Sequence, residues 1–263
     1  DYAVAMNSGT ATLHAALESC DVQPGDEVIS PALTVIMDTT ATLHANAVPV
    51  YADIDPETFN IDVDDVRRKI TDKTKAIIAV SLYGLPADLD ALRVLADEAG
   101  VALIEDNAQC VGAHLKGELV GSWGHVSSWS FENTKHLSAG EGGMVTTNSE
   151  PLATKMRKFG GHGFKNLGAS EGRVRLNQSI FQDPDYKRHD SLGWNYRMPE
   201  FIAAVALAQL ERAHELVSFR QASAEALLSA MTGCAFLVPQ MVPADRSNAY
   251  YTLGVRFDEN EAG

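Results

Sequence analysis

The feature that most constrains the fold is a regular alternation of short apolar runs with segments of helical spacing. The runs are rich in β-branched residues and cover 2–6, 27–30, 49–54, 76–82, 101–105, 126–131 and 143–147. The segments that read as helices are 10–19, 34–45, 63–70 and 88–100. Such alternation favours an α/β fold in which a mostly parallel sheet is covered by helices on both faces.

A long helix is predicted from 199 to about 231. Its apolar residues recur at steps of three and four along one side, and they are Ala203, Ala206, Leu207, Leu210, Ala213 and Val217. We therefore expect a large domain over 1–198, then a bridging helix and the start of a smaller α/β domain over 199–263. Because the chain opens and closes near strand-like runs (2–6 and 249–257), we expect it to be the middle of a longer protein.

Composition excludes several classes of function. With 21 Lys and Arg against 35 Asp and Glu, the net charge of −14 argues against a nucleic-acid binder. Three scattered cysteines predict neither a disulfide framework nor a metal site, and their odd number fits a cytoplasmic protein. The sequence contains no run of 18 apolar residues, so no membrane span is predicted, and no signal peptide is visible.

Three short segments carry candidate chemistry. Ser8, Gly9 and Thr10 follow a strand and open a helix, where backbone N–H groups bind anions; a helix cap without a ligand is the alternative. Asp106 follows the strand 101–105 at its carboxyl end, where it either holds a protonated ring nitrogen or caps the next helix. Lys135 lies between a strand and a glycine cluster, and it is either a Schiff-base lysine or an ordinary surface residue.

Taken together, these segments meet the needs of a pyridoxal 5′-phosphate (PLP) site. The phosphate needs a helix N-terminus, the pyridinium needs a carboxylate, and the aldehyde needs a lysine amine. The sequence resembles the DegT/DnrJ/EryC1/StrS family of sugar aminotransferases, within the fold-type I PLP-dependent enzymes. The segments that carry the resemblance are 8–10, 24–28, 53–55, 105–109, 130–135, 140–143 and 193–198.

The resemblance implies a role for several residues around the cofactor ring. Lys135 would join the aldehyde as a Schiff base and later move a proton between the substrate Cα and the cofactor C4′. Asp106 would keep the pyridine nitrogen protonated, and Gln109 would contact the ring or its hydroxyl group. Many relatives stack an aromatic residue on the ring at the position of Val35, which can only pack its methyl groups there.

The resemblance also implies how the phosphate is held. Ser8, Gly9, Thr10 and Ser130 would bind it within one chain. Asn195 would reach the phosphate of the neighbouring subunit's cofactor, because members of the family form homodimers with shared active sites.

Substrate contacts are predicted in two places. The segment 161–193 lacks a clear period and is rich in cations: His162, Lys165, Arg173, Arg175, Lys187, Arg188 and His189. Of these we assign His162, Arg173 and Arg175 to a nucleotide diphosphate or a substrate carboxylate, a solvated loop being the alternative. Asp38 either contacts a substrate hydroxyl or is a solvated helix residue.

The resemblance implies an aminotransferase that moves an amino group from glutamate or glutamine to a keto-sugar, with the nucleotide-linked form favoured. The cofactor would cycle through pyridoxamine 5′-phosphate (PMP), and the product would feed amino-sugar biosynthesis. A free cyclitol ketone is an alternative acceptor, and a PLP-dependent sugar dehydratase is an alternative enzyme. In some relatives a histidine replaces the lysine and the enzyme is a dehydratase. The spacing from Ser130 to Lys135 favours the aminotransferase and makes His136 a neighbour of the catalyst.

Overall fold

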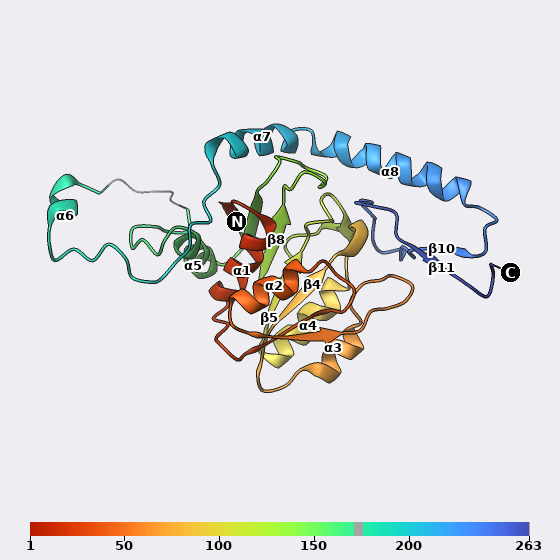
Figure 1. The fold of residues 1–263 in the computed structure, drawn as a ribbon, viewed down its shortest axis with the longest axis horizontal. Coiled ribbons are helices and arrows are strands. Elements are labelled where there is room, and N and C mark those ends of the chain that lie inside the picture. The colour runs from red at the N-terminus through yellow and green to blue at the C-terminus, as the bar shows by residue number, and fades with distance from the viewer. Residues whose placement is uncertain (171–175, 263) are drawn as a thin grey trace.

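The computed structural model describes residues 1–170 and 176–262, and its centre is a seven-stranded sheet with the order β1-β9-β8-β5-β4-β2-β3. All of its strands run parallel except β9, which pairs antiparallel with both β1 and β8. Figure 1 shows β8, β5 and β4 side by side in the middle of the sheet. The strands are β1 (Tyr2–Met6), β2 (Glu27–Pro31), β3 (Val48–Ala52), β4 (Thr74–Val80), β5 (Ala102–Asp106), β8 (Val126–Ser130) and β9 (Gly143–Thr147). The predicted α/β class with a mostly parallel sheet is confirmed.

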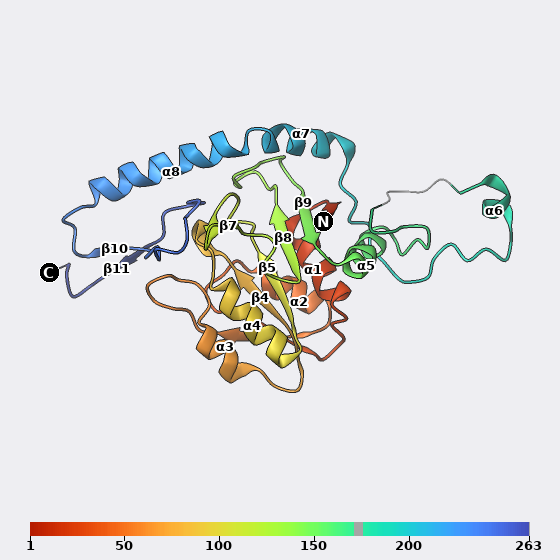
Figure 2. The ribbon, with the colours of Figure 1, turned by 180° about the vertical axis from the view of Figure 1, so that it is seen from behind.

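Helices cover both faces of this sheet. One face carries α1 (Gly9–Ser19), α2 (Met37–His44) and α5 (Glu150–Gly160). The opposite face, seen from behind in Figure 2, carries α3 (Val63–Lys69) and α4 (Leu89–Ala99). The four helical segments predicted before residue 101 are therefore all present, each shifted by no more than a few residues.

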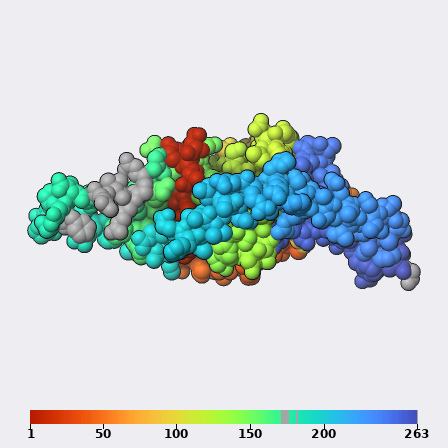
Figure 3. Space-filling view, turned by 90° about the horizontal axis from the view of Figure 1, so that it is seen from above, coloured from red at the N-terminus to blue at the C-terminus, as the bar shows by residue number. Residues whose placement is uncertain are grey.

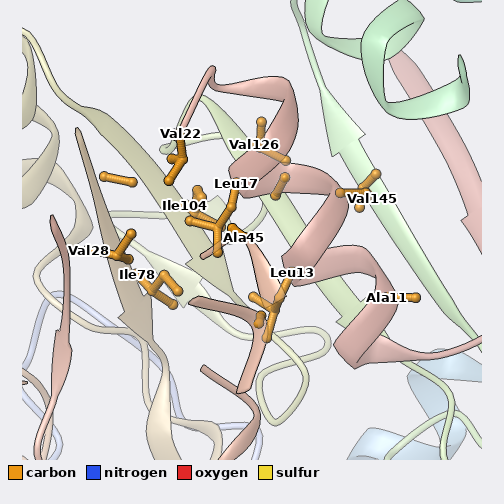
Figure 4. Packing of buried hydrophobic residues seen from close by; sticks show 14 of the residues in the cluster. Ala11, Leu13, Leu17, Val22, Val28, Ala45, Ile78, Ile104, Val126 and Val145 are labelled. Atoms are coloured by element: carbon orange, nitrogen blue, oxygen red, sulfur yellow. The ribbon is translucent and has the colours of Figure 1, made fainter. Parts of the chain in front are cut away.

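Helix α1 lies in the middle of the first core. Leu13 and Leu17 point from it toward Val28, Ile78 and Ile104 on the sheet (Figure 4). Its polar residues Thr12 and His14 are buried as well, so the helix is enclosed nearly all round. This burial fixes the N-terminus of α1 firmly against the ends of the neighbouring strands.

The long helix predicted from 199 to about 231 is two helices, α7 (Glu200–Leu210) and α8 (Ala213–Ala230). The break falls at Arg212, whose backbone has φ −109° and ψ 12° and whose guanidinium binds Glu215 at 3.0 Å. Together the two helices run across the top of the molecule (Figure 3). Helix α8 buries Val217 and Ala224, whereas no residue of α7 is buried.

The remaining elements are short. They are the turn η1 (Leu82–Gly84), the hairpin β6 (His114–Leu115) with β7 (Glu118–Leu119), helix α6 (Gln178–Gln182), and the pair β10 (Leu237–Pro239) with β11 (Val255–Phe257). The strand-like run 249–257 thus forms a strand only over its last three residues. The predicted loop 161–193 contains α6, while Arg173 and Arg175 lie outside the described residues. The domain boundary at 198 stays a prediction.

Two findings concern the described part of the chain alone. Within it, every helix is too short or too polar to cross a bilayer. Across residues 1–170 and 176–262, no three His, Cys, Asp or Glu residues are grouped so that they could hold a metal ion.

Candidate active site

A cavity of about 280 Å³ lies where the carboxyl ends of β5 and β8 meet the N-terminus of α1. It is lined by Ser8, Gly9, Thr10, Leu13, Val35, Met37, Asp106, Ala108, Ser130, Glu132, Lys135 and Glu141. The fold therefore brings the three predicted segments, which are far apart in the sequence, to one site. Open α/β sheets bind their ligands at this edge, outside the carboxyl ends of the strands.

The anion end of the cavity is built by the first turn of α1. Ser8 caps the helix from an extended conformation, and its hydroxyl oxygen accepts a hydrogen bond from the backbone N–H of Ala11 at 3.1 Å. A Cβ atom on Gly9 would come within 2.8 Å of the Ser130 Cβ atom, so only glycine lets the turn approach β8 this closely. The positive end of the helix dipole and the Ser130 hydroxyl thus meet at one point.

The opposite end of the cavity carries Asp106, the last residue of β5. This carboxyl is 2% exposed, and its Oδ1 accepts a hydrogen bond from the backbone N–H of Ala108 at 2.9 Å. Burial raises the pKa of Asp106, while the Ala108 N–H and the nearby Lys135 ammonium act in the opposite direction. The arrangement suits a carboxylate that awaits a cationic partner.

Asp38, on α2, lies beside Asp106. Its exposed fraction is 0%, so the alternative of a solvated helix residue is wrong. The Thr34 hydroxyl donates to its Oδ2, whereas its Oδ1 has no hydrogen-bond partner among the described residues. Burial, and then the charge of Asp106, raise the pKa of Asp38 well above its ordinary value. The residues lining the cavity include its neighbours Val35 and Met37 but not Asp38 itself.

Lys135 is half-buried in the loop 131–142 that follows β8, and its ammonium group lies 4.6 Å from the centre of the Tyr251 ring. Arg220, on α8, donates hydrogen bonds to the carbonyl oxygens of Thr134 at 2.9 Å, Lys135 at 3.2 Å and Tyr251 at 2.8 Å. Arg220 and Tyr251 were not predicted from the sequence. Both are more than 80 residues away along the chain, so no local spacing marks them.

His136, next in sequence, is not among the residues that line the cavity. Its side chain is 3% exposed, and its Nε2 atom is 3.0 Å from the carbonyl oxygen of Ala249. Burial lowers the pKa of His136 to about 4, so the ring is neutral at pH 7. It ties the Lys135 loop to the C-terminal segment.

Gln109 and Glu105 lie close to Asp106 in sequence, and neither is among the residues that line the cavity. Gln109 is 4% exposed, and its Oε1 accepts from the Tyr83 backbone N–H at 2.8 Å, which leaves its amide nitrogen as a donor. Glu105, for which no role is predicted from the sequence, accepts four hydrogen bonds. Its donors are Gly121 N, Gly124 N, the Ser127 hydroxyl and the Asn107 amide. Glu105 thereby fixes the end of β5 and the direction of Asp106.

Asn195 and His162 do not line this chain's own cavity. Asn195 is exposed; it pairs with Gly161 in an isolated bridge, and its Oδ1 accepts from Arg197 Nε at 3.0 Å. His162 is half-buried, and its Nε2 lies 3.3 Å from the same guanidinium, at Nη2. The structure thus groups these two residues with Arg197 on a separate surface.

The residues present fit PLP by their chemistry. A glycine-dependent cradle for an anion, a buried carboxyl group and a lysine amine face one cavity. The sheet and the site together define the class: an α/β fold of the PLP-dependent aminotransferase type. The chain matches the sequence model of the DegT/DnrJ/EryC1/StrS aminotransferase family over residues 1–262, and it belongs to that family.

Relatives of known name agree with this placement. GDP-perosamine synthase from Vibrio cholerae is 35% identical over 251 residues, which are 95% of this chain and 63% of that protein. The L-glutamine:2-deoxy-scyllo-inosose aminotransferase of Streptoalloteichus tenebrarius is 39% identical over 262 residues, which are 98% of this chain and 59% of that protein. The chain thus spans about three fifths of the length of these two relatives.

Solved structures show the same fold. An aminotransferase from Psychrobacter cryohalolentis superimposes with a TM-score of 0.87 at 37% identity, covering 99% of this chain and 66% of that one. The PLP form of Spr1654 from Streptococcus pneumoniae superimposes with a TM-score of 0.84 at 25% identity, covering 98% of this chain and 67% of that one.

Proposed function

We propose that the protein to which this chain belongs is a PLP-dependent sugar aminotransferase. The observation that carries the proposal is that Lys135, Asp106 and the N-terminus of α1 line one cavity. Family membership supports the reaction type, and the PLP form of Spr1654 supports the cofactor. When bound, PLP supplies an aldehyde and a ring that withdraws electrons from a bond at the substrate Cα.

Each residue of the cavity has a task toward that cofactor. Gly9, Thr10 and Ser130 bind the phosphate, with Ser8 holding the turn in place. Asp106 keeps a proton on the ring nitrogen because its buried charge is stabilised by an adjacent cation. Val35 packs against one face of the ring.

Two groups act on the substituents of the ring and on the reacting proton. Gln109 offers its free amide N–H to the ring hydroxyl. The Lys135 amine would take the proton from the Cα of the amino-acid donor and deliver it to the cofactor C4′.

We propose a keto-sugar and an amino acid as the two substrates. GDP-perosamine synthase points to a nucleotide-linked sugar, whereas the scyllo-inosose aminotransferase points to a free cyclitol ketone with glutamine as donor. Asp38 is not given a substrate contact in this proposal, because it is fully buried and does not line the cavity. The three free cysteines, an odd number, favour the cytoplasm.

We propose further that two copies form a homodimer with shared active sites. Helix α7 buries none of its residues in the single chain, and the side chains of Phe201, Leu207 and Leu210 are 87%, 57% and 58% exposed. An apolar surface of this kind marks an interface. Asn195 and His162 lie outside their own chain's cavity and would serve the partner's.

The experiment is a product analysis with the full-length protein, PLP, and either glutamate or glutamine. Nucleotide-linked keto-sugars and a keto-cyclitol are offered as acceptors, and the products are identified by mass spectrometry. We expect an amine from one acceptor class and none with Lys135→Ala. A deoxy product in place of an amine would instead establish a dehydratase.

A further inference from the structure

Two buried carboxyl groups lie side by side at the ring end of the cavity. Asp38 comes from α2 and Asp106 from the end of β5, and their exposed fractions are 0% and 2%. Val35 and Met37, the neighbours of Asp38, line the same cavity as Asp106, and burial and the charge of Asp106 raise the pKa of Asp38. Two adjacent carboxylates in a buried site repel strongly, and one of them is expected to keep its proton.

One buried oxygen atom of the two carboxyl groups lacks a hydrogen-bond donor among the described residues. Asp38 Oδ2 accepts from the Thr34 hydroxyl, and Asp106 Oδ1 accepts from the Ala108 backbone N–H. Asp38 Oδ1 is fully buried and finds no donor among the described residues. Ionised carboxylates only accept hydrogen bonds, so a proton on Asp38 Oδ1 would satisfy this atom by turning it into a donor to the Asp106 carboxylate.

The surroundings decide which group holds the proton. Asp106 has a backbone N–H and the Lys135 ammonium near it, and both stabilise its ionised form. Among the residues that the structure describes, Asp38 accepts from the neutral Thr34 hydroxyl and is acted on by the charge of Asp106. Burial and that charge both raise the pKa of Asp38.

We propose that Asp38 is a positioning residue that carries a proton on Oδ1 and donates it in a hydrogen bond to the Asp106 carboxylate. The bond holds Asp106 ionised and directed at the cavity, where it would face the ring nitrogen of PLP. This role for Asp106 rests on the proposed function, whereas the carboxyl pair itself does not. Asparagine at position 38 preserves a neutral donor of the same shape, and leucine removes it.

The first test is infrared spectroscopy of the full-length protein without cofactor at pH 7. We expect the carbonyl stretch of a protonated, buried carboxyl group, with its isotope shift in D₂O, in the difference spectrum of wild type minus Asp38→Asn. Asp64→Asn, at an exposed position of α3, is the matched control and leaves that band unchanged. A wild type without the band, or a band that persists in Asp38→Asn, would overturn the proposal.

The second test is the dissociation constant of PLP, measured by titration without any amino donor. Asp38→Asn is expected to bind within about threefold of wild type, and Asp38→Leu roughly tenfold or more weakly, because Asp106 loses its donor. Circular dichroism verifies that both variants are folded. Equal affinity in a folded Asp38→Leu variant contradicts the positioning role. If wild type binds no PLP, the proposed function fails, and the infrared band still decides the carboxyl pair.

Discussion

Tyr251 lies against Lys135: the lysine ammonium is 4.6 Å from the centre of the tyrosine ring, and the Tyr251 hydroxyl is 2.8 Å from that of Thr134. The contact joins the loop that carries the lysine to a segment more than 100 residues further along. Arg220 completes it with three hydrogen bonds to backbone carbonyls. The position of the lysine therefore depends on α8 and on the C-terminal segment, and not on the sheet alone.

Replacing Arg220 by alanine removes these three hydrogen bonds and releases the Lys135 loop. We expect the free energy of unfolding to fall by about 2 kcal/mol and the dissociation constant of PLP to rise roughly tenfold. Arg256→Ala is the control, since Arg256 is exposed and its guanidinium pairs with the nearby Asp258 at 3.4 Å. Urea denaturation and PLP titration measure the two quantities. Equal losses of stability and PLP affinity in both variants would mean that Arg220 does not hold the Lys135 loop.

Adding one methyl group at Gly9 tests the anion cradle. The new Cβ atom meets the Ser130 Cβ at 2.8 Å, so the turn must move away from β8. Such overpacking costs about 1–3 kcal/mol, and we expect PLP and free phosphate to bind Gly9→Ala much more weakly. Gly168→Ala is the matched control, because a Cβ there meets nothing within 4 Å. Unchanged phosphate affinity in Gly9→Ala would show that the anion binds elsewhere.

Glu105 is expected to contribute to the stability of the fold and not to the binding of PLP. In Glu105→Gln an amide group faces the N–H of Gly124 and the other donors, which leaves buried donors without an acceptor. We predict a loss of about 3 kcal/mol in the free energy of unfolding, with PLP affinity retained while the protein is folded. Glu98→Gln, at a surface pair with Arg67, should change stability by less than about 0.5 kcal/mol. A Glu105→Gln variant as stable as wild type contradicts this assignment.

The lowered pKa of His136 predicts how the free energy of unfolding changes with pH. Its pKa falls from the ordinary 6.5 to about 4 in the folded protein, so between these values the unfolded chain binds more protons. Stability contributed by the neutral ring is thus complete above pH 6.5 and is lost, up to about 3 kcal/mol, as the pH falls to 4. His136→Gln should unfold with a flatter pH dependence between pH 7 and 4.5. The exposed His114→Gln should follow wild type, and parallel curves for all three proteins would refute the burial argument.

Much of the fold could be predicted because its signals are local. The runs 2–6 and 143–147 coincide with β1 and β9, and Asp106 falls at the end of β5 as expected. Each strand is marked by a short apolar run, and its end is marked by the polar or glycine-rich residues that follow. The cavity then follows from chain topology, since parallel strands end at one edge of the sheet.

The failures concern contacts between distant segments. The apolar period runs on through Glu211 and Arg212, so nothing local marks the break between α7 and α8. The sequence leaves Asp38 between a substrate contact and a solvated helix residue, because it does not show which side of the helix meets the sheet; packing of α2 buries it. Arg220 acts on a loop some 85 residues away, which no periodicity can reveal.

The central claim is that PLP binds in this cavity and is held covalently by Lys135. The most direct measurement is an absorbance scan of the full-length protein with PLP, followed by borohydride reduction and peptide mass spectrometry. We expect a visible band that glutamate or glutamine bleaches, and after reduction a pyridoxyl group on the peptide that contains Lys135. In Lys135→Ala both should be absent. A protein that shows no band after PLP is supplied, or that carries the label on another lysine, would contradict the account.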